Sequence, residues 1–182
     1  MTVKLTTLIT AAALALAACS QQAETSVAPD SAAPAASAET AVQSLTSSDG
    51  AVTINTAGNF ADQSGNAELM PEGFSAEEIT LLQRDEQSGI TLYAAALGSP
   101  KTPSAEYFAK LKTELEKAEN LSNLKIGAAT ENRMDYSFTQ DNDFQEDCIA
   151  LHTAERLYTI CANGSGVPTN QLAAVLKDVK LK

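Results

Sequence analysis

The sequence contains no tryptophan, one histidine and few basic residues, and each shortage argues against a class of function. Its 182 residues include 12 Lys and Arg against 23 Asp and Glu, which gives a formal net charge of −11. A chain this acidic is a poor ligand for nucleic acid, because neutralising phosphates takes clustered Lys and Arg. Aromatic residues make up 5% of the chain, which disfavours a surface that stacks bases or sugars. One His and three Cys cannot assemble the usual zinc sites, so we expect no metal and no cofactor.

The first 18 residues have the features of an export signal. Lys4 is the only charged residue before Glu24, and the stretch from Leu5 to Ala18 is apolar apart from three threonines. This stretch is too short to span a bilayer, which takes ~20 residues. A basic start, an apolar middle and small residues at the end are typical of a secretory signal peptide.

The segment ends in Leu16-Ala17-Ala18-Cys19, which resembles the bacterial lipobox. In lipoproteins with that motif the cysteine is lipidated, the peptide before it is cleaved and the new amino terminus is acylated. The alternative is an ordinary signal peptide followed by a chance cysteine. We expect residues 1–18 to be the signal peptide and Cys19 to carry the lipid that holds the protein on a membrane, facing the periplasm.

The residue after the cysteine bears on which membrane is used. In enteric-type lipoprotein sorting, Asp at this place favours the inner membrane and Ser favours onward transport. Ser20 therefore implies the outer membrane by that resemblance. Cleavage would also remove Lys4, leaving a mature chain of net charge −12 that anionic phospholipid repels. The acyl group, not the protein surface, is then the expected anchor.

Composition divides the rest of the chain into a tether and a domain. Residues 20–45 are rich in Ala, Ser, Pro, Gln, Thr and Glu, with no basic or aromatic residue. Such a segment buries too little apolar surface to offset the entropy of ordering. An alanine-rich helix is the alternative, which Pro29 and Pro34 disfavour. We expect residues 19–45 to be a lipidated, disordered tether and residues 46–182 to be one globular domain.

In residues 46–182 the apolar residues recur at the spacings typical of strands in some stretches and of helices in others. Thr102 and Pro103 predict the start of a helix that ends near Asn120, with Thr102 as its cap. Pro168 precedes a second helix, whose apolar positions extend to Val179. We read residues 140–146 as an acidic loop. Hairpins dominate, so we expect an α+β domain with a mostly antiparallel sheet flanked by helices. The predicted strands are 51–55, 79–83, 90–97, 124–130, 134–139, 147–153 and 156–162.

The start of the domain resembles the DcrB-type envelope lipoproteins. The similarity is carried by Asp49-Gly50-Ala51-Val52-Thr53-Ile54, by Phe60-Ala61-Asp62-Gln63-Ser64-Gly65 and by the order of the elements that follow. The resemblance covers about residues 46–182. It implies a PsbP/Mog1-like α-β-α sandwich, an antiparallel sheet with helices on both faces, and no catalytic residues. The pair Cys148 and Cys161 is not part of that pattern.

Cys148 and Cys161 predict a disulfide. With Cys19 consumed by lipid, two thiols remain in an exported domain, and an even count in an oxidising compartment favours a bond. A tight turn at Ala154-Glu155 makes every cross-strand pair sum to 309, and these two cysteines satisfy that sum. We therefore expect them to face each other on one side of a hairpin, as a non-hydrogen-bonded pair. Ile149 and Ile160 should then face the main core.

Three other patterns have a functional and a structural interpretation. The acidic run 141–147 has oxygens for calcium, but it lacks the spacing of an EF-hand, and a solvated loop is the simpler interpretation. His152 has no nucleophile beside it in a recognisable motif, so we assign it no chemical task. Gly164-Ser165-Gly166 precedes a helix and could hold an anion, but Pro168 removes a donor, which favours a plain loop.

These observations favour a binding protein over an enzyme. The leading hypothesis is a membrane-anchored, periplasm-facing lipoprotein that acts as a non-enzymatic binding or accessory module of the cell envelope and contacts an unidentified envelope protein. The alternative is a lipoprotein that binds a small ligand or a metal in a pocket between sheet and helix. A polar pocket would favour the second hypothesis, and a flat apolar patch the first.

Replacing Cys19 with Ser tests the anchor. Without the thiol no acyl chain can be attached, so the protein should move from the membrane pellet to the soluble fraction, and the wild-type protein should carry the added mass of its lipid. Fractionation and intact mass measure both. A variant that stays in the pellet with the wild-type mass contradicts the lipoprotein assignment.

Overall fold

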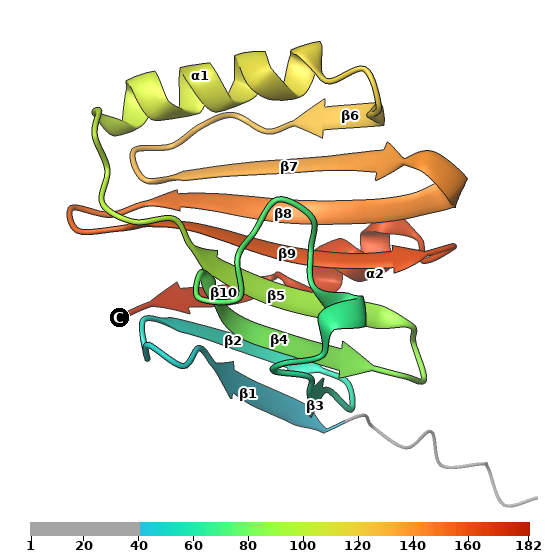
Figure 1. Ribbon diagram of the computed structural model, residues 1–182. Coiled ribbons are helices and arrows are strands. Elements are labelled where there is room, and N and C mark those ends of the chain that lie inside the picture. Colours follow the sequence, from blue (N-terminus) through green and yellow to red (C-terminus); the bar gives the residue numbers. More distant parts are fainter. Residues whose placement is uncertain (1–40) are drawn as a thin grey trace, which may run out of the picture. The chain divides into compact units, whose positions relative to one another are not determined.

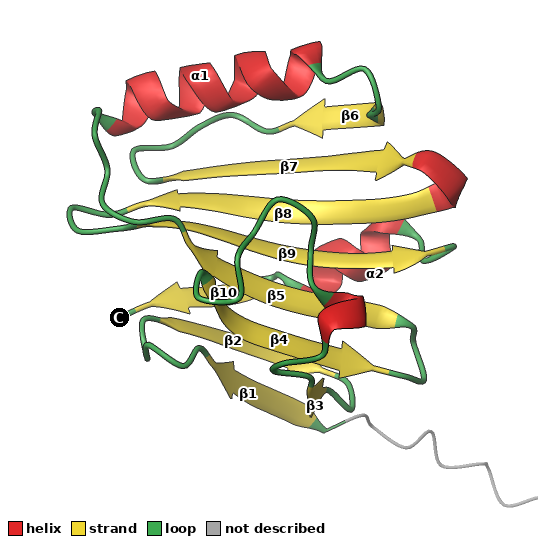
Figure 2. Ribbon diagram, viewed as in Figure 1, coloured by secondary structure: helices red, strands yellow, loops and turns green. Residues whose placement is uncertain are grey.

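The computed structural model describes residues 41–182, which form two antiparallel sheets, two α-helices and two short 3₁₀ helices, Ala67–Leu69 and Asp141–Asp143 (Figures 1 and 2). Cys19, the signal peptide 1–18 and residues 20–40 of the expected tether lie outside the described residues. In chain order the elements are β1 (Val42–Thr46), β2 (Val52–Ala57), β3 (Ala61–Asp62), β4 (Ile79–Asp85), β5 (Ile90–Ala96), α1 (Ser104–Lys117), β6 (Ser122–Ile126), β7 (Arg133–Gln140), β8 (Phe144–His152), β9 (Leu157–Ser165), α2 (Thr169–Val175) and β10 (Asp178–Leu181).

The larger sheet has seven strands in the order β3-β4-β5-β9-β8-β7-β6, and all its neighbours are antiparallel. A smaller sheet has the order β1-β2-β10. The expected α+β class, with an antiparallel sheet flanked by helices, is confirmed. Consecutive strands pair wherever a short hairpin joins them, which is why the sequence order predicts most of the topology.

Two hydrophobic clusters lie on opposite faces of the large sheet. One face packs against α2 and β2 and contains Ile149, Ile160 and Leu172, each almost fully buried. The other face packs against α1, through Phe108, and against the segment that joins β3 to β4. Figure 1 shows that segment crossing in front of the sheet, with α2 behind it. Ile149 and Ile160, the pair expected on the apolar side of the hairpin, do lie in the first and larger of these clusters.

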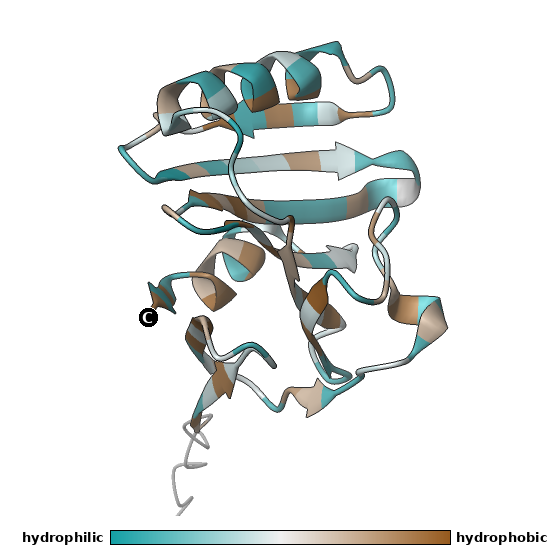
Figure 3. Ribbon diagram, turned by 60° about the vertical axis from the view of Figure 1, so that its left-hand side comes forward, coloured by the Kyte–Doolittle hydropathy of each residue, from teal (hydrophilic) through white to brown (hydrophobic). Residues whose placement is uncertain are grey.

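Helix α1 is amphipathic, and the colouring in Figure 3 alternates between hydrophilic and hydrophobic around it. Its apolar face presents Phe108, Leu111 and Leu115 to the sheet, at spacings of three and four residues that place them on one side of a helix. The helix begins at Ser104, one residue later than expected, and Pro103 occupies the capping position without a side-chain hydrogen bond. The carbonyl of Thr102 instead lies 2.9 Å from Nε2 of His152.

The β8–β9 hairpin has the predicted register. Every pair from Phe144↔Ser165 to His152↔Leu157 sums to 309, and Cys148 lies opposite Cys161. The two cysteines form a disulfide with their Cα atoms 4.2 Å apart, close to the ~4.5 Å of a non-hydrogen-bonded pair. The two cysteines are 13 residues apart in the sequence. If the bond acts by reducing the entropy of the unfolded chain, closing a loop of this length stabilises the fold by roughly 3 kcal/mol.

Three strands were missed: β1 and β10 of the small sheet, and the two-residue β3 at the edge of the large sheet. Strand β1 begins at Val42, so the boundary expected at residue 46 is wrong by four residues. Leu45 packs on the core, and the Gln43 side chain accepts from Phe60 N at 2.7 Å and donates to Phe60 O at 3.2 Å. Composition conceals this strand because Val42, Ser44 and Thr46 are exposed, and only Gln43 and Leu45 turn toward the core.

Strand β10 replaces the end of the second predicted helix. Helix α2 ends at Val175, and Val179 pairs with Ile54 of β2 instead of continuing the helix. The error has a physical cause, since Val179 fits a helical spacing from Leu172 and also alternates with Leu181 as a strand does. No helix within residues 41–182 is long and apolar enough to cross a membrane.

Removing β1 should destabilise the domain. A chain that begins at Ser47 loses one edge of the small sheet and the packing of Leu45, so we expect about 2 kcal/mol less stability and a Tm lower by roughly 5–10 °C. The control is a chain that begins at Ala41, which keeps β1 and should have the same Tm as the full mature protein. Equal melting of the two shortened chains would mean that β1 adds nothing to the fold.

Candidate functional site

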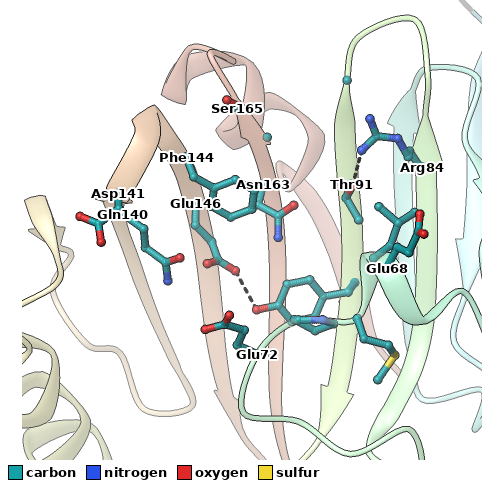
Figure 4. Close-up of a pocket in the computed structure, with 16 residues that line it drawn as sticks. Glu68, Glu72, Arg84, Thr91, Gln140, Asp141, Phe144, Glu146, Asn163 and Ser165 are labelled. Atoms are coloured by element: carbon teal, nitrogen blue, oxygen red, sulfur yellow. Dashed lines mark hydrogen bonds between the residues drawn. The ribbon is translucent and has the colours of Figure 1, made fainter. Parts of the chain in front are cut away.

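A pocket of about 570 Å³ opens on the face of the large sheet that carries the disulfide. Its floor is formed by β5, β9 and β8, and its outer wall by residues 68–72 of the segment between β3 and β4 (Figure 4). A second cavity of about 440 Å³ continues toward α1. The two cavities share Glu72, Tyr93, Gln140 and Glu146, so they form one groove with these residues at the junction.

Strand alternation and register bring the floor residues together. Thr91 pairs with Asn163, and Asn163 pairs with Glu146, so the three side chains form a row across β5, β9 and β8. In the next row Tyr93 pairs with Cys161, and Cys161 with Cys148. Because successive side chains point to opposite faces, a shift of one residue in either pairing would remove this floor.

Tyr93 and Glu146 make the central contact of the site. The Tyr93 hydroxyl donates to Oε1 of Glu146 at 2.7 Å, although β9 lies between their strands (Figure 4). The side chain at the intervening position is the short Cys161. The Asn163 side chain lies beside Glu146, because the two residues are cross-strand partners. The hydroxyl and the amide are both neutral.

The environment perturbs the groups that titrate. Burial raises the pKa of Glu146 above its ordinary 4.5, and the hydrogen bond from Tyr93, together with the neighbouring Asn163 amide, offsets only part of this rise. Burial, with the nearby Glu146 charge, raises the pKa of Tyr93, and the same two causes raise the pKa of Tyr136. Burial, with repulsion from Asp135, also raises the pKa of Asp147 to about 6. A buried carboxyl with a raised pKa, such as that of Glu146, is a common feature of functional sites.

Glycine shapes one end of the pocket. A Cβ atom at Gly164 would lie 2.6 Å from Cγ2 of Val167 and 2.9 Å from the carbonyl oxygen of Gly89. Both Gly164 and Gly89 line the pocket, so a side chain at residue 164 would push apart the backbone segments that form this end.

The site corrects one sequence interpretation. Residues 140–146 were expected to be a solvated acidic loop, but only Asp141–Asp143 form a turn, and β8 already begins at Phe144. Glu146 is 6% exposed. The acidic run is therefore partly an exposed turn and partly the start of β8. Because side chains alternate between the two faces of a strand, Glu146 points into the pocket. The 309 register could have revealed this, because it places Glu146 opposite Asn163 on the cysteine face.

The other candidate residues lie outside the groove or at its edge. His152 ends β8, lines neither cavity of the groove and packs beside Tyr107 and Phe108. The loop expected at Gly164 and Ser165 is instead the end of β9, and both residues line the pocket. Glu146, Cys148 and Cys161 have ligand atoms within 4.8 Å of one another. The two sulfurs are bonded to each other, however, and metals bind the thiolate.

Comparison with known proteins adds a similarity of fold. No family model and no curated protein matches the chain. Among solved structures it is similar to the solution structure of cyanobacterial PsbP (CyanoP) from Synechocystis sp. PCC 6803, at 9% identity and a TM-score of 0.49. The match covers 82% of this chain and 98% of that one. The function of the groove therefore has to be inferred from its own residues, and the DcrB-type resemblance stays a prediction.

The buried carboxyl predicts a pH-dependent effect of Glu146→Gln. The amide still accepts a hydrogen bond from Tyr93 but carries no charge, so the variant should be more stable than wild type at pH 8. A carboxyl whose pKa is raised by folding loses stability as pH rises from its ordinary 4.5 through the raised value. The difference between the proteins should therefore shrink toward pH 4.5, measured by urea unfolding.

Glu119→Gln at an exposed position is the matched control and should follow wild type. If Glu146→Gln is less stable than wild type at every pH, attractive contacts to the carboxylate outweigh the cost of burying it.

Proposed function

We propose that this protein is a non-enzymatic binding module of the bacterial cell envelope, anchored through Cys19 and facing the periplasm, that takes a small molecule in the groove. The observation that carries the proposal is the convergence of Tyr93, Glu146 and Asn163 on the floor of a pocket of about 570 Å³. That volume is in the range of small-molecule sites, which are concave and carry a few placed polar groups.

The surface argues for a small molecule over an apolar protein partner. Among residues 41–182, Val42 is the one large hydrophobic residue that is exposed to solvent, at 72%. A single residue does not make the contiguous apolar patch that typically marks a protein-binding face. A partner protein in the envelope is therefore the second candidate, and the experiment below separates the two.

Photo-cross-linking from the groove tests the proposal. A benzophenone amino acid at Gln140, which lines both cavities, is irradiated in intact cells, and the adduct is measured by mass spectrometry. We expect an added mass on the order of a few hundred daltons, the class of molecule that such a cavity holds. The same probe at exposed Lys125, on edge strand β6, is the control.

An adduct of protein size at Gln140 would overturn the small-molecule assignment in favour of a protein partner. The absence of any adduct that is specific to Gln140 would contradict a binding role for the groove.

A further inference from the structure

The charges that line the pocket are predominantly negative. Four carboxyl side chains belong to it, and its single basic residue is Arg84. The guanidinium of Arg84 is already engaged, because Nε donates to Glu86 at 3.0 Å and Nη1 to Thr91 at 2.9 Å. The potential inside the pocket is therefore negative and attracts cations. The four carboxyl residues are Glu68, Glu72, Asp141 and Glu146.

Glu146 is buried in this pocket without a counter-charge. It is 6% exposed, and no basic side chain among residues 41–182 forms an ion pair with it. Buried charges in proteins are ordinarily paired, because removing a carboxylate from water is costly. The raised pKa of Glu146 reflects that cost, and a bound cation would remove it.

Aromatic rings line the groove that holds the carboxyl. Tyr93 and Phe144 line the first cavity, and Phe74, whose ring centroid lies 5.8 Å from that of Tyr93, lines the second. Tyr136 and Phe138 stack on the same side of the sheet, with centroids 6.2 Å apart. The faces of such rings attract organic cations.

We propose that the groove binds a small organic cation, a primary or substituted ammonium group, with the Glu146 carboxylate as its counter-ion and aromatic rings beside it. This proposal rests on the proposed function and names the chemical class of the ligand. A hard divalent metal fits less well, because it needs six or more oxygen ligands, whereas the groove offers aromatic carbon around one buried carboxyl.

Three probes of one shape and different charge test the proposal. The mature lipoprotein in detergent is titrated calorimetrically at pH 7.5 with 2-phenylethylammonium, 2-phenylethanol and phenylacetate. We expect the ammonium to bind about tenfold more tightly than the neutral alcohol, the difference that a hydrogen bond to a charged group makes, and phenylacetate to bind most weakly.

Variants locate the effect. Glu146→Gln should abolish the tenfold preference and still bind the alcohol, which a general loss of structure would not allow. Glu72→Gln, at the exposed rim and so without risk to folding, should reduce the preference two- to threefold. Glu119→Gln, outside the groove, should bind all three probes as wild type does.

Equal binding of the ammonium and the alcohol would overturn the cation assignment and leave the groove a binding site for other molecules. A failure of all three probes to bind would overturn it as well, while the cross-link from Gln140 separately decides whether the groove is occupied. Displacement of the ammonium by equimolar Ca²⁺ would reassign the pocket to a metal.

Discussion

The pairing of β8 with β9 is the constraint on which the rest of the domain depends. A slip of β8 by one residue would exchange the two faces of that strand, taking Ile149 out of the larger core and Glu146 out of the pocket. The disulfide between Cys148 and Cys161 holds that register by a covalent bond. Because β5 pairs with the other edge of β9, the same register sets where the Tyr93 hydroxyl meets Glu146.

The two faces of the large sheet are used differently. One face is closed by α2 and β2 over a continuous apolar cluster, which contains most of the buried hydrophobic residues. The other is covered by α1 and by the segment between β3 and β4, which leave a groove between them. A buried carboxyl with an unfavourable solvation energy can persist on this second face because the first face, together with the disulfide, stabilises the fold.

Much of the architecture follows from local patterns, and the errors have physical reasons. The hairpins, the apolar face of α1 and the cysteine pairing could be predicted, because each depends on period, turn position or register along one stretch of chain. Strand β1 could not, since Gln43 and Leu45 gain their partners only when Phe60 and the core are in place. Strand β10 was mistaken for helix because its apolar spacing satisfies both periods, and only pairing with β2 decides between them.

The sequence by itself determined the acidic character of the chain, the α+β class and the register of the cysteine hairpin, and the lipobox-like pattern at Cys19 is where it predicts a lipid anchor. Each of these depends on neighbouring residues or on arithmetic along the chain. Only the tertiary structure decided that Glu146 is buried, that the Tyr93 hydroxyl reaches it across β9 and that a pocket lies above them. The reason is that burial and cavity shape arise from elements far apart in sequence, here β5, β8, β9 and residues 68–72, packing together.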